Sequence, residues 1–187
     1  MQALIVVDAQ NEFSAEGLRP VRNYDDAIAR IKDHVENARM HGWPIAWIRH
    51  HNRPDESRAF VPGSWGAELS PGLGPDASRS DETLFEKDVF GAFTGTELEH
   101  WLKVRGVTAI TLAGFYTHMC VSTSAREALV RGFGVSLDPE ATGACDLHSD
   151  TLGSQSAEEV RRTALLQLSN MGAAIIQGER QAARSAR

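Results

Sequence analysis

The stretch that decides the fold is VTAITLAGFYTHMCVSTSAREALVRGF, residues 107–133. Its first part, 107–113, is rich in apolar and β-branched residues, which predicts a buried strand. Gly114 interrupts this run, and apolar residues then recur at helical spacing until Gly132 ends the pattern. The stretch therefore predicts a strand, a tight turn and a helix, with Cys120 in the first turn of the helix.

A cysteine in this position has the surroundings of a nucleophile. The free N–H groups and the positive dipole end of a helix N-terminus favour a thiolate, and they can lower the thiol pKa from ~8.5 to roughly 3.5–7.5. The sequence is equally consistent with Cys120 as a small, inert residue of the core, because free cysteines are commonly buried. Iodoacetamide separates the two interpretations. A catalytic Cys120 is expected to be alkylated well below pH 8, and Cys145 is not.

Length and composition describe an ordinary globular domain. We expect one domain over residues 1–187, with residues 178–187 as a frayed polar tail. The net charge of -6 argues against a nucleic-acid partner, which would require a basic face. The apolar runs are too short to cross a bilayer, and the first residues, MQALIVVDAQNEF, lack the basic region and cleavage site of a signal peptide. We therefore expect a cytoplasmic protein that binds no membrane.

The two cysteines, Cys120 and Cys145, do not form a disulfide framework, and a domain of this size does not need one. A bridge between them is conceivable but disfavoured in a reducing compartment. Neither cysteine belongs to a CxxC pair, so the sequence offers no structural zinc site of the thiolate type.

Strand and helix patterns alternate along almost the whole chain. Further strands are predicted at 3–7, 44–48, 83–85, 133–137 and 173–176. Helices are predicted after Asn23, after a capping box of Thr94 with Glu97, and after a second capping box of Ser156 with Glu159. Residues 52–82, which contain many of the prolines and glycines, are expected to form a packed covering loop. This order predicts an α/β fold of three layers, α/β/α, with a Rossmann-like, six-stranded, mostly parallel sheet and helices on both faces.

Three chemically active side chains follow predicted strands. Asp8 follows the strand at 3–7, Lys87 follows the strand at 83–85, and Cys120 follows the strand at 107–113. Ligands of open α/β sheets bind at the carboxyl ends of the strands. A thiol nucleophile needs a proton acceptor and a nearby positive charge, which Asp8 and Lys87 can supply. Taken singly, Asp8 could equally be a carboxylate that caps the following turn, and Lys87 could be an exposed surface lysine.

Three segments carry a resemblance to a known family. VVDAQNEF at 6–13, EKDVFGAFTGTELE at 86–99 and AGFYTHMCVSTSAREALVRGF at 113–133 resemble the signature segments of the isochorismatase-like cysteine hydrolases. This superfamily includes nicotinamidases, N-carbamoylsarcosine amidase, and ureidoacrylate and maleamate amidohydrolases. The resemblance runs from about residue 3 to residue 177, and it is specific for the superfamily but not for a substrate.

The resemblance implies roles for particular residues. It implies a catalytic triad of Asp8, Lys87 and Cys120, and a cis peptide bond between Phe115 and Tyr116. It also implies that the backbone amides of Tyr116 and Cys120 form an oxyanion hole, in which one donor is typically worth ~100–1,000-fold in turnover.

The sequence departs from the metal site of the family's nicotinamidases, which is an Asp-x-His followed by a second His after the second strand. This chain has His50 and His51 followed by Asn52, with Glu56 nearby. Zinc on His50 and Glu56 remains an alternative, but the expected carboxylate and paired imidazoles are out of place. We expect no metal and no cofactor, and a structural or substrate-orienting role for the histidine pair.

Five aromatic or imidazole side chains are candidates for the walls of a substrate pocket: Phe13, Trp65, Phe90, Tyr116 and His118. Each of them also fits a plain core position. Tyr116 stands where the family usually has a small residue, so the pocket is expected to be narrow there. Candidate cations are few, chiefly Arg49 and Arg53, so the sequence does not require a highly anionic substrate.

The resemblance favours a metal-independent cysteine hydrolase that cleaves a C–N bond of a small amide, lactam, ureido or carbamoyl compound through a thioester. Two alternatives remain: an isochorismatase-type vinyl ether hydrolase, and a non-catalytic member that binds a ligand. The complete triad favours C–N cleavage. The resemblance also implies a homo-oligomer, either a dimer or a tetramer.

Overall fold

The structure, a computed structural model, describes residues 1–53 and 55–176. The predicted frayed tail at 178–187 lies outside the described residues. A six-stranded sheet forms the centre, in the order β3-β2-β1-β4-β5-β8, and neighbouring strands pair in parallel. The strands are β1 (Gln2–Val7), β2 (Ile45–His50), β3 (Glu82–Lys87), β4 (Ala109–Phe115), β5 (Gly134–Gly143) and β8 (Ala174–Ile175).

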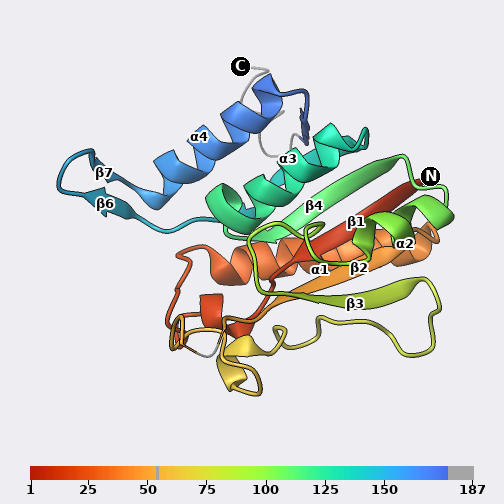
Figure 1. Ribbon diagram of the computed structural model, residues 1–187, viewed down its shortest axis with the longest axis horizontal. Coiled ribbons are helices and arrows are strands. Elements are labelled where there is room, and N and C mark those ends of the chain that lie inside the picture. Colours follow the sequence, from red (N-terminus) through yellow and green to blue (C-terminus); the bar gives the residue numbers. More distant parts are fainter. Residues whose placement is uncertain (54, 177–187) are drawn as a thin grey trace.

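Helices cover both faces of this sheet, so the predicted three-layer α/β/α fold is confirmed (Figure 1). The helices are α1 (Tyr24–Met40), α2 (Leu98–Val104), α3 (Ser122–Val130) and α4 (Ala157–Asn170). Alternate residues of β1 enter two separate cores. Ile5 and Val7 pack with residues of α2, α3 and α4. Leu4 and Val6 pack with residues of α1 on the other face. β1 is therefore the buried centre of the molecule, as its continuous apolar sequence predicts.

Two features of the local prediction were wrong. α2 begins at Leu98 rather than after a Thr94 capping box, because the Thr94 hydroxyl is bonded to the carboxylate of Glu127 instead. β5 continues beyond Leu137 to Gly143, with an irregularity in its pairing with β4. The capping box of Ser156 and Glu159 at the start of α4 is confirmed.

A short hairpin of β6 (Leu147–Ser149) and β7 (Gly153–Gln155) was not predicted. It projects from the body of the protein before α4 (Figure 1). Its strands have three residues each, which is too few for a period-2 pattern to stand out in the sequence.

The described part of the covering loop packs on the end of β1, as predicted. Phe60 and Ala67 of this loop are buried. The buried carboxylate of Glu12 accepts the backbone N–H of Phe60 over 3.0 Å, and the Gln10 amide donates to the Ala67 carbonyl oxygen over 2.7 Å. Glu12, which lies in η1 (Asn11–Phe13), and Gln10, just before η1, therefore attach the loop to the carboxyl edge of the sheet.

The approach of β4 to β1 at this edge requires a glycine. Gly114 has a φ of +123°, and a Cβ atom built on it would lie 1.8 Å from the Val7 carbonyl oxygen. Any larger residue would push the two strands apart. The close contact keeps the end of β4 beside the end of β1, and the predicted cis peptide bond between Phe115 and Tyr116 follows directly.

None of the helices within residues 1–53 and 55–176 has both the length and the apolarity that a bilayer-spanning helix needs.

A buried carboxylate joins α1 to β5. The side chain of Asp138 is fully buried, and its Oδ2 accepts from Arg30 over 2.6 Å and lies 2.8 Å from His34 Nε2. Burial by itself would raise the pKa of Asp138, but the hydrogen bonds from His34, Arg30 and the Glu140 backbone outweigh it and lower the pKa from 3.8 to about 2. The folded state therefore favours the ionised carboxylate.

We predict that Asp138→Asn lowers the free energy of unfolding at pH 7 by about 2 kcal/mol, the equivalent of the pKa shift. A lowered pKa stabilises the fold fully above the unfolded value near 3.8, and this contribution disappears as the pH falls towards 2. Urea unfolding at several pH values should show that the free energies of unfolding of the parent protein and of Asp138→Asn converge as the pH falls below 4. Asp33→Asn is the control, because Asp33 also pairs with Arg30 but is exposed. A difference that persists at pH 2 contradicts the prediction.

Candidate active site

The three predicted triad residues lie at the carboxyl edge of the sheet, after β1, at the end of β3 and in the turn after β4. Asp8 follows β1, and Lys87 is the last residue of β3. The Lys87 Nζ atom is 2.7 Å from Asp8 Oδ2, and both side chains are at most 1% exposed. Asp8 Oδ1 is buried and has no hydrogen-bond partner among the described residues. This second oxygen is therefore free to accept a proton.

Cys120 lies in η3 (Thr117–Val121), a single π-helical turn between β4 and α3. The predicted strand, turn and helix are confirmed, although Cys120 precedes the regular α-helix rather than lying in its first turn. Its backbone carbonyl accepts the Ser124 hydroxyl over 2.7 Å. Cys120 is 8% exposed, and the Asp8 carboxylate and the Lys87 ammonium lie close enough to act on its thiol.

The environment raises the pKa of the Cys120 thiol, so the expectation of a lowered pKa was wrong. Burial is the largest cause, the Asp8 carboxylate adds to it, and the Lys87 ammonium opposes it. The charges of Asp8 and Lys87 balance each other, so a thiolate would be an additional buried anion. Cys120 is therefore a thiol in the resting protein, and its proton has an acceptor in Asp8.

Lys87 stays charged in this site. Burial alone would lower its pKa, but the Asp8 carboxylate and Cys120 outweigh burial and raise it. The Lys87 Nζ donates to Asp8 Oδ2, to the Val89 carbonyl oxygen over 3.1 Å, and towards His50 Nδ1 at 3.3 Å. The sequence did not predict the contact between His50 and Lys87, although it places His50 between a predicted strand and the predicted covering loop. Only the register of β2 on β3, which pairs His50 with Lys87, reveals it.

The residues around His50 do not fit a zinc ion. His50 Nδ1 faces the Lys87 ammonium, a cation that excludes a metal from this nitrogen, and His50 Nε2 is bonded to Asn52 Oδ1 over 2.9 Å. Glu56 accepts the backbone N–H of Arg53. Throughout the described part of the chain, no three His, Cys, Asp or Glu side chains are grouped as metal ligands.

Three of the five predicted pocket walls, Phe13, Tyr116 and His118, lie packed together near the end of β4. The rings of Phe13 and Tyr116 meet edge to face with centroids 4.8 Å apart, and Tyr116 stacks on the His118 ring. The Tyr116 hydroxyl donates to the Arg19 carbonyl oxygen over 2.8 Å. Burial lowers the pKa of His118, and its Nδ1 atom has no partner in the described ranges.

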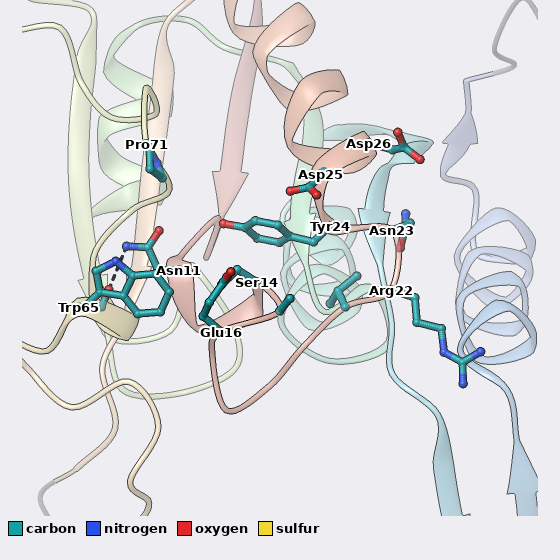
Figure 2. Close-up of a pocket in the computed structure, with 12 residues that line it drawn as sticks. Asn11, Ser14, Glu16, Arg22, Asn23, Tyr24, Asp25, Asp26, Trp65 and Pro71 are labelled. Carbon is teal, nitrogen blue, oxygen red and sulfur yellow. Dashed lines mark hydrogen bonds between the residues drawn. The ribbon is translucent and has the colours of Figure 1, made fainter.

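The other two predicted walls, Trp65 and Phe90, are more than half exposed. Trp65 lines a cavity of about 530 Å³ whose wall also includes Asn11, Ser14 and Tyr24 (Figure 2). Asp8, Lys87 and Cys120 do not line this cavity. The structure thus brings Phe13, Tyr116 and His118 together and leaves Trp65 and Phe90 at the surface.

Two residues of α3 that sequence reasoning missed hold the segment after Lys87. The Ser124 hydroxyl accepts the backbone N–H of Ala92 over 3.0 Å, and the Glu127 carboxylate accepts that of Phe93 over 2.9 Å. Because Ser124 also donates to the Cys120 carbonyl, this contact connects the Lys87 strand end to the Cys120 turn. Both cysteines are free, so Cys120 and Cys145 do not form a bridge.

Comparisons with known proteins agree with this geometry. The Isochorismatase domain model matches residues 2–180. The chain is 32% identical over 144 residues to the secreted isochorismatase effector Isc1 of Verticillium dahliae, covering 77% of this chain and 73% of that protein. It is 30% identical over 163 residues to nicotinamidase 3 of Arabidopsis thaliana, covering 80% and 78%.

A solved isochorismatase structure from Pseudomonas putida KT2440 superimposes with a TM-score of 0.84 at 28% identity, covering 93% of this chain and 86% of that one. The domain model spans nearly the whole chain, and the solved fold agrees with the sheet described above. The chain therefore belongs to the isochorismatase family of hydrolases.

Proposed function

We propose that the protein is a metal-independent cysteine hydrolase that cleaves a C–N bond of a small amide, lactam, ureido or carbamoyl compound. The observation that carries this proposal is the buried ion pair of Asp8 and Lys87 beside the Cys120 thiol. An acid with one free oxygen, a fixed cation and a thiol are the parts that acyl transfer through a thioester requires. Similarity to a nicotinamidase, whose name denotes amide hydrolysis, supports the choice of bond.

In the proposed reaction, Asp8 takes the proton of Cys120 as sulfur attacks the carbonyl carbon and a C–S bond forms. The backbone amides of Tyr116 and Cys120 stabilise the oxyanion. Asp8 then returns the proton to the leaving nitrogen, and the C–N bond breaks. Water attacks the thioester with Asp8 as base, which releases the acid product and restores the thiol. No oxidant or reductant takes part.

Lys87 has an electrostatic role in this scheme. It offsets the negative charge that Asp8 carries at rest and that sulfur acquires when the proton moves. The high pKa of the Cys120 thiol then becomes consistent with catalysis, because proton transfer accompanies attack and no stable thiolate is needed.

We assign substrate contacts to Phe13, Trp65, Phe90, Tyr116 and His118. Phe13 and Tyr116 would form a packed wall, and the unpartnered Nδ1 of His118 would bind a polar group of the substrate. The exposed Trp65 and Phe90 suit the mouth of the pocket or a subunit contact. We extend the proposal to a cytoplasmic homo-oligomer, either a dimer or a tetramer.

Vinyl ether hydrolysis is the second candidate, and the similarity to an isochorismatase effector favours it. Isochorismate carries two carboxylates, so its pocket needs basic groups. The two candidate cations are already paired: Arg49 with Glu68 and Glu86, and Arg53 with Asp88. This pairing is the reason that we place C–N cleavage first. The complete triad argues against the third candidate, a member that only binds a ligand.

A substrate panel tests the proposed function. We expect one or more small amides or ureides, among them nicotinamide and ureidoacrylate, to release ammonia, and isochorismate to release no pyruvate. Turnover should be unchanged by a chelator, because the residues around His50 do not fit a metal. Pyruvate release without ammonia release would favour the second candidate.

We predict that Cys120→Ala lowers turnover of the best panel compound by more than about 1,000-fold, because only binding and oxyanion stabilisation remain. Mass spectrometry of the quenched parent protein should detect an acyl adduct on Cys120. Cys145→Ala is the control and should keep both activity and adduct. Normal turnover by Cys120→Ala or Cys120→Ser would rule out the thioester mechanism.

We predict opposite effects of Asp8→Asn on turnover and on thiol reactivity. Turnover should fall by roughly 100- to 10,000-fold, because the proton acceptor is lost. Iodoacetamide should alkylate Cys120 faster at pH 7, because the carboxylate that raises the thiol pKa has gone while the Lys87 ammonium remains. In the parent protein, alkylation should still be increasing above pH 8. Slower alkylation of the variant would show that Asp8 does not act on this thiol.

A further inference from the structure

His50 is a buried polar side chain to which the proposed reaction assigns no task. It is the last residue of β2, it is 8% exposed, and its ring meets the Phe60 ring edge to face. Its Nδ1 atom lies 3.3 Å from the Lys87 Nζ atom. Buried polar atoms are usually hydrogen-bonded, and each ring nitrogen of His50 has a partner: Nδ1 faces Lys87 and Nε2 faces Asn52.

The contacts of Asn52 determine which nitrogen of His50 carries the proton. Asn52 Nδ2 donates to the Ala59 carbonyl oxygen over 2.7 Å. The other amide atom, Oδ1, therefore faces His50 Nε2 at 2.9 Å. An amide oxygen can only accept, so Nε2 must be the donor. In the neutral ring the lone pair is then on Nδ1, the nitrogen that faces Lys87.

This lone pair completes the coordination of the Lys87 ammonium. An ammonium has three N–H donors, and Lys87 has three acceptors: Asp8 Oδ2, the Val89 carbonyl oxygen and His50 Nδ1. Asp8 and Val89 leave one donor unassigned. Without His50, this donor would have only the Cys120 sulfur, a weak acceptor, as a partner, and Nζ could rotate away from its place beside Asp8.

We propose that His50 is the positioning residue of Lys87. A chain of hydrogen bonds runs from the Ala59 carbonyl in the covering loop through Asn52 and His50 to Lys87, and it holds the ammonium between Asp8 and the Cys120 thiol. The inference rests on the proposed function, because it gives Lys87 the task of easing the ionisation of Cys120. It assigns a positioning role to a histidine for which the sequence had indicated a metal ligand, a structural residue or a residue that orients the substrate.

Two conservative variants separate this role from a packing role. In His50→Asn, the amide oxygen occupies nearly the place of Nδ1 and can accept from Lys87. In His50→Gln, the amide reaches the place of Nε2, beside Asn52, and leaves Lys87 without its third acceptor. His51→Gln is the matched control, because the His51 side chain lies towards the exposed Glu86 and has no side-chain contact with Lys87.

The first measurement needs no substrate. The rate of Cys120 alkylation by iodoacetamide at a fixed pH is followed by mass spectrometry, with thermal unfolding of each variant measured alongside. We expect His50→Gln to slow alkylation by about tenfold, since a nearby cation lowers a thiol pKa by one to three units and part of that effect is lost. His50→Asn and His51→Gln should alkylate like the parent protein. On the best panel compound, His50→Gln should lower kcat by as much as about 100-fold and leave KM nearly unchanged.

Equal alkylation rates and equal kcat values for His50→Asn and His50→Gln would overturn the positioning role, whether both match the parent or both fall together. This comparison holds even if one substitution lowers the unfolding temperature, because alkylation is measured on the folded fraction well below it. Activity retained by Cys120→Ala would instead reject the proposed function. An inactive Cys120→Ala beside a fully active His50→Gln would leave the proposed function standing and reject the role of His50.

Discussion

The buried ion pair of Asp8 and Lys87 constrains the rest of the candidate active site. Two charges with almost no exposure are stable only when each has a partner, and removal of one partner typically costs 3–5 kcal/mol, because it leaves an unpaired charge in the interior. The two residues are 79 positions apart in the chain. Only the carboxyl edge of a parallel sheet, with β1 at its centre, brings them together and keeps them together.

The surrounding structure supports this pair from several sides. Gly114 lets β4 approach β1 closely enough to place the Cys120 turn beside Asp8. Ser124 joins the Cys120 turn to the segment that follows Lys87. The covering loop is attached to the same edge by Glu12 and Gln10. The site is thus assembled from strand ends and one loop, on a sheet whose two faces are both buried by helices.

The electrostatics of the site are consistent with the proposed role of Cys120 as a nucleophile, although its thiol pKa is raised. A free thiolate would be a second anion in a buried site where Asp8 and Lys87 already balance. In the proposed reaction, the proton therefore stays on sulfur until a carbonyl group arrives, and Asp8 takes it during attack. A resting thiol is also less exposed to oxidation than a resting thiolate, since reactivity of this kind follows thiolate character.

The sequence by itself determined the alternation of strand and helix, the parallel sheet, and the three strand ends that carry Asp8, Lys87 and Cys120. These follow from local periodicity and from the rule that parallel strands share one carboxyl edge. Tertiary structure decided the remaining features. It placed His50 beside Lys87 through the register of β2 on β3, left Trp65 and Phe90 at the surface, and raised the Cys120 pKa. Burial and contacts between distant segments set these properties, and neither is encoded in the spacing of residues along one segment.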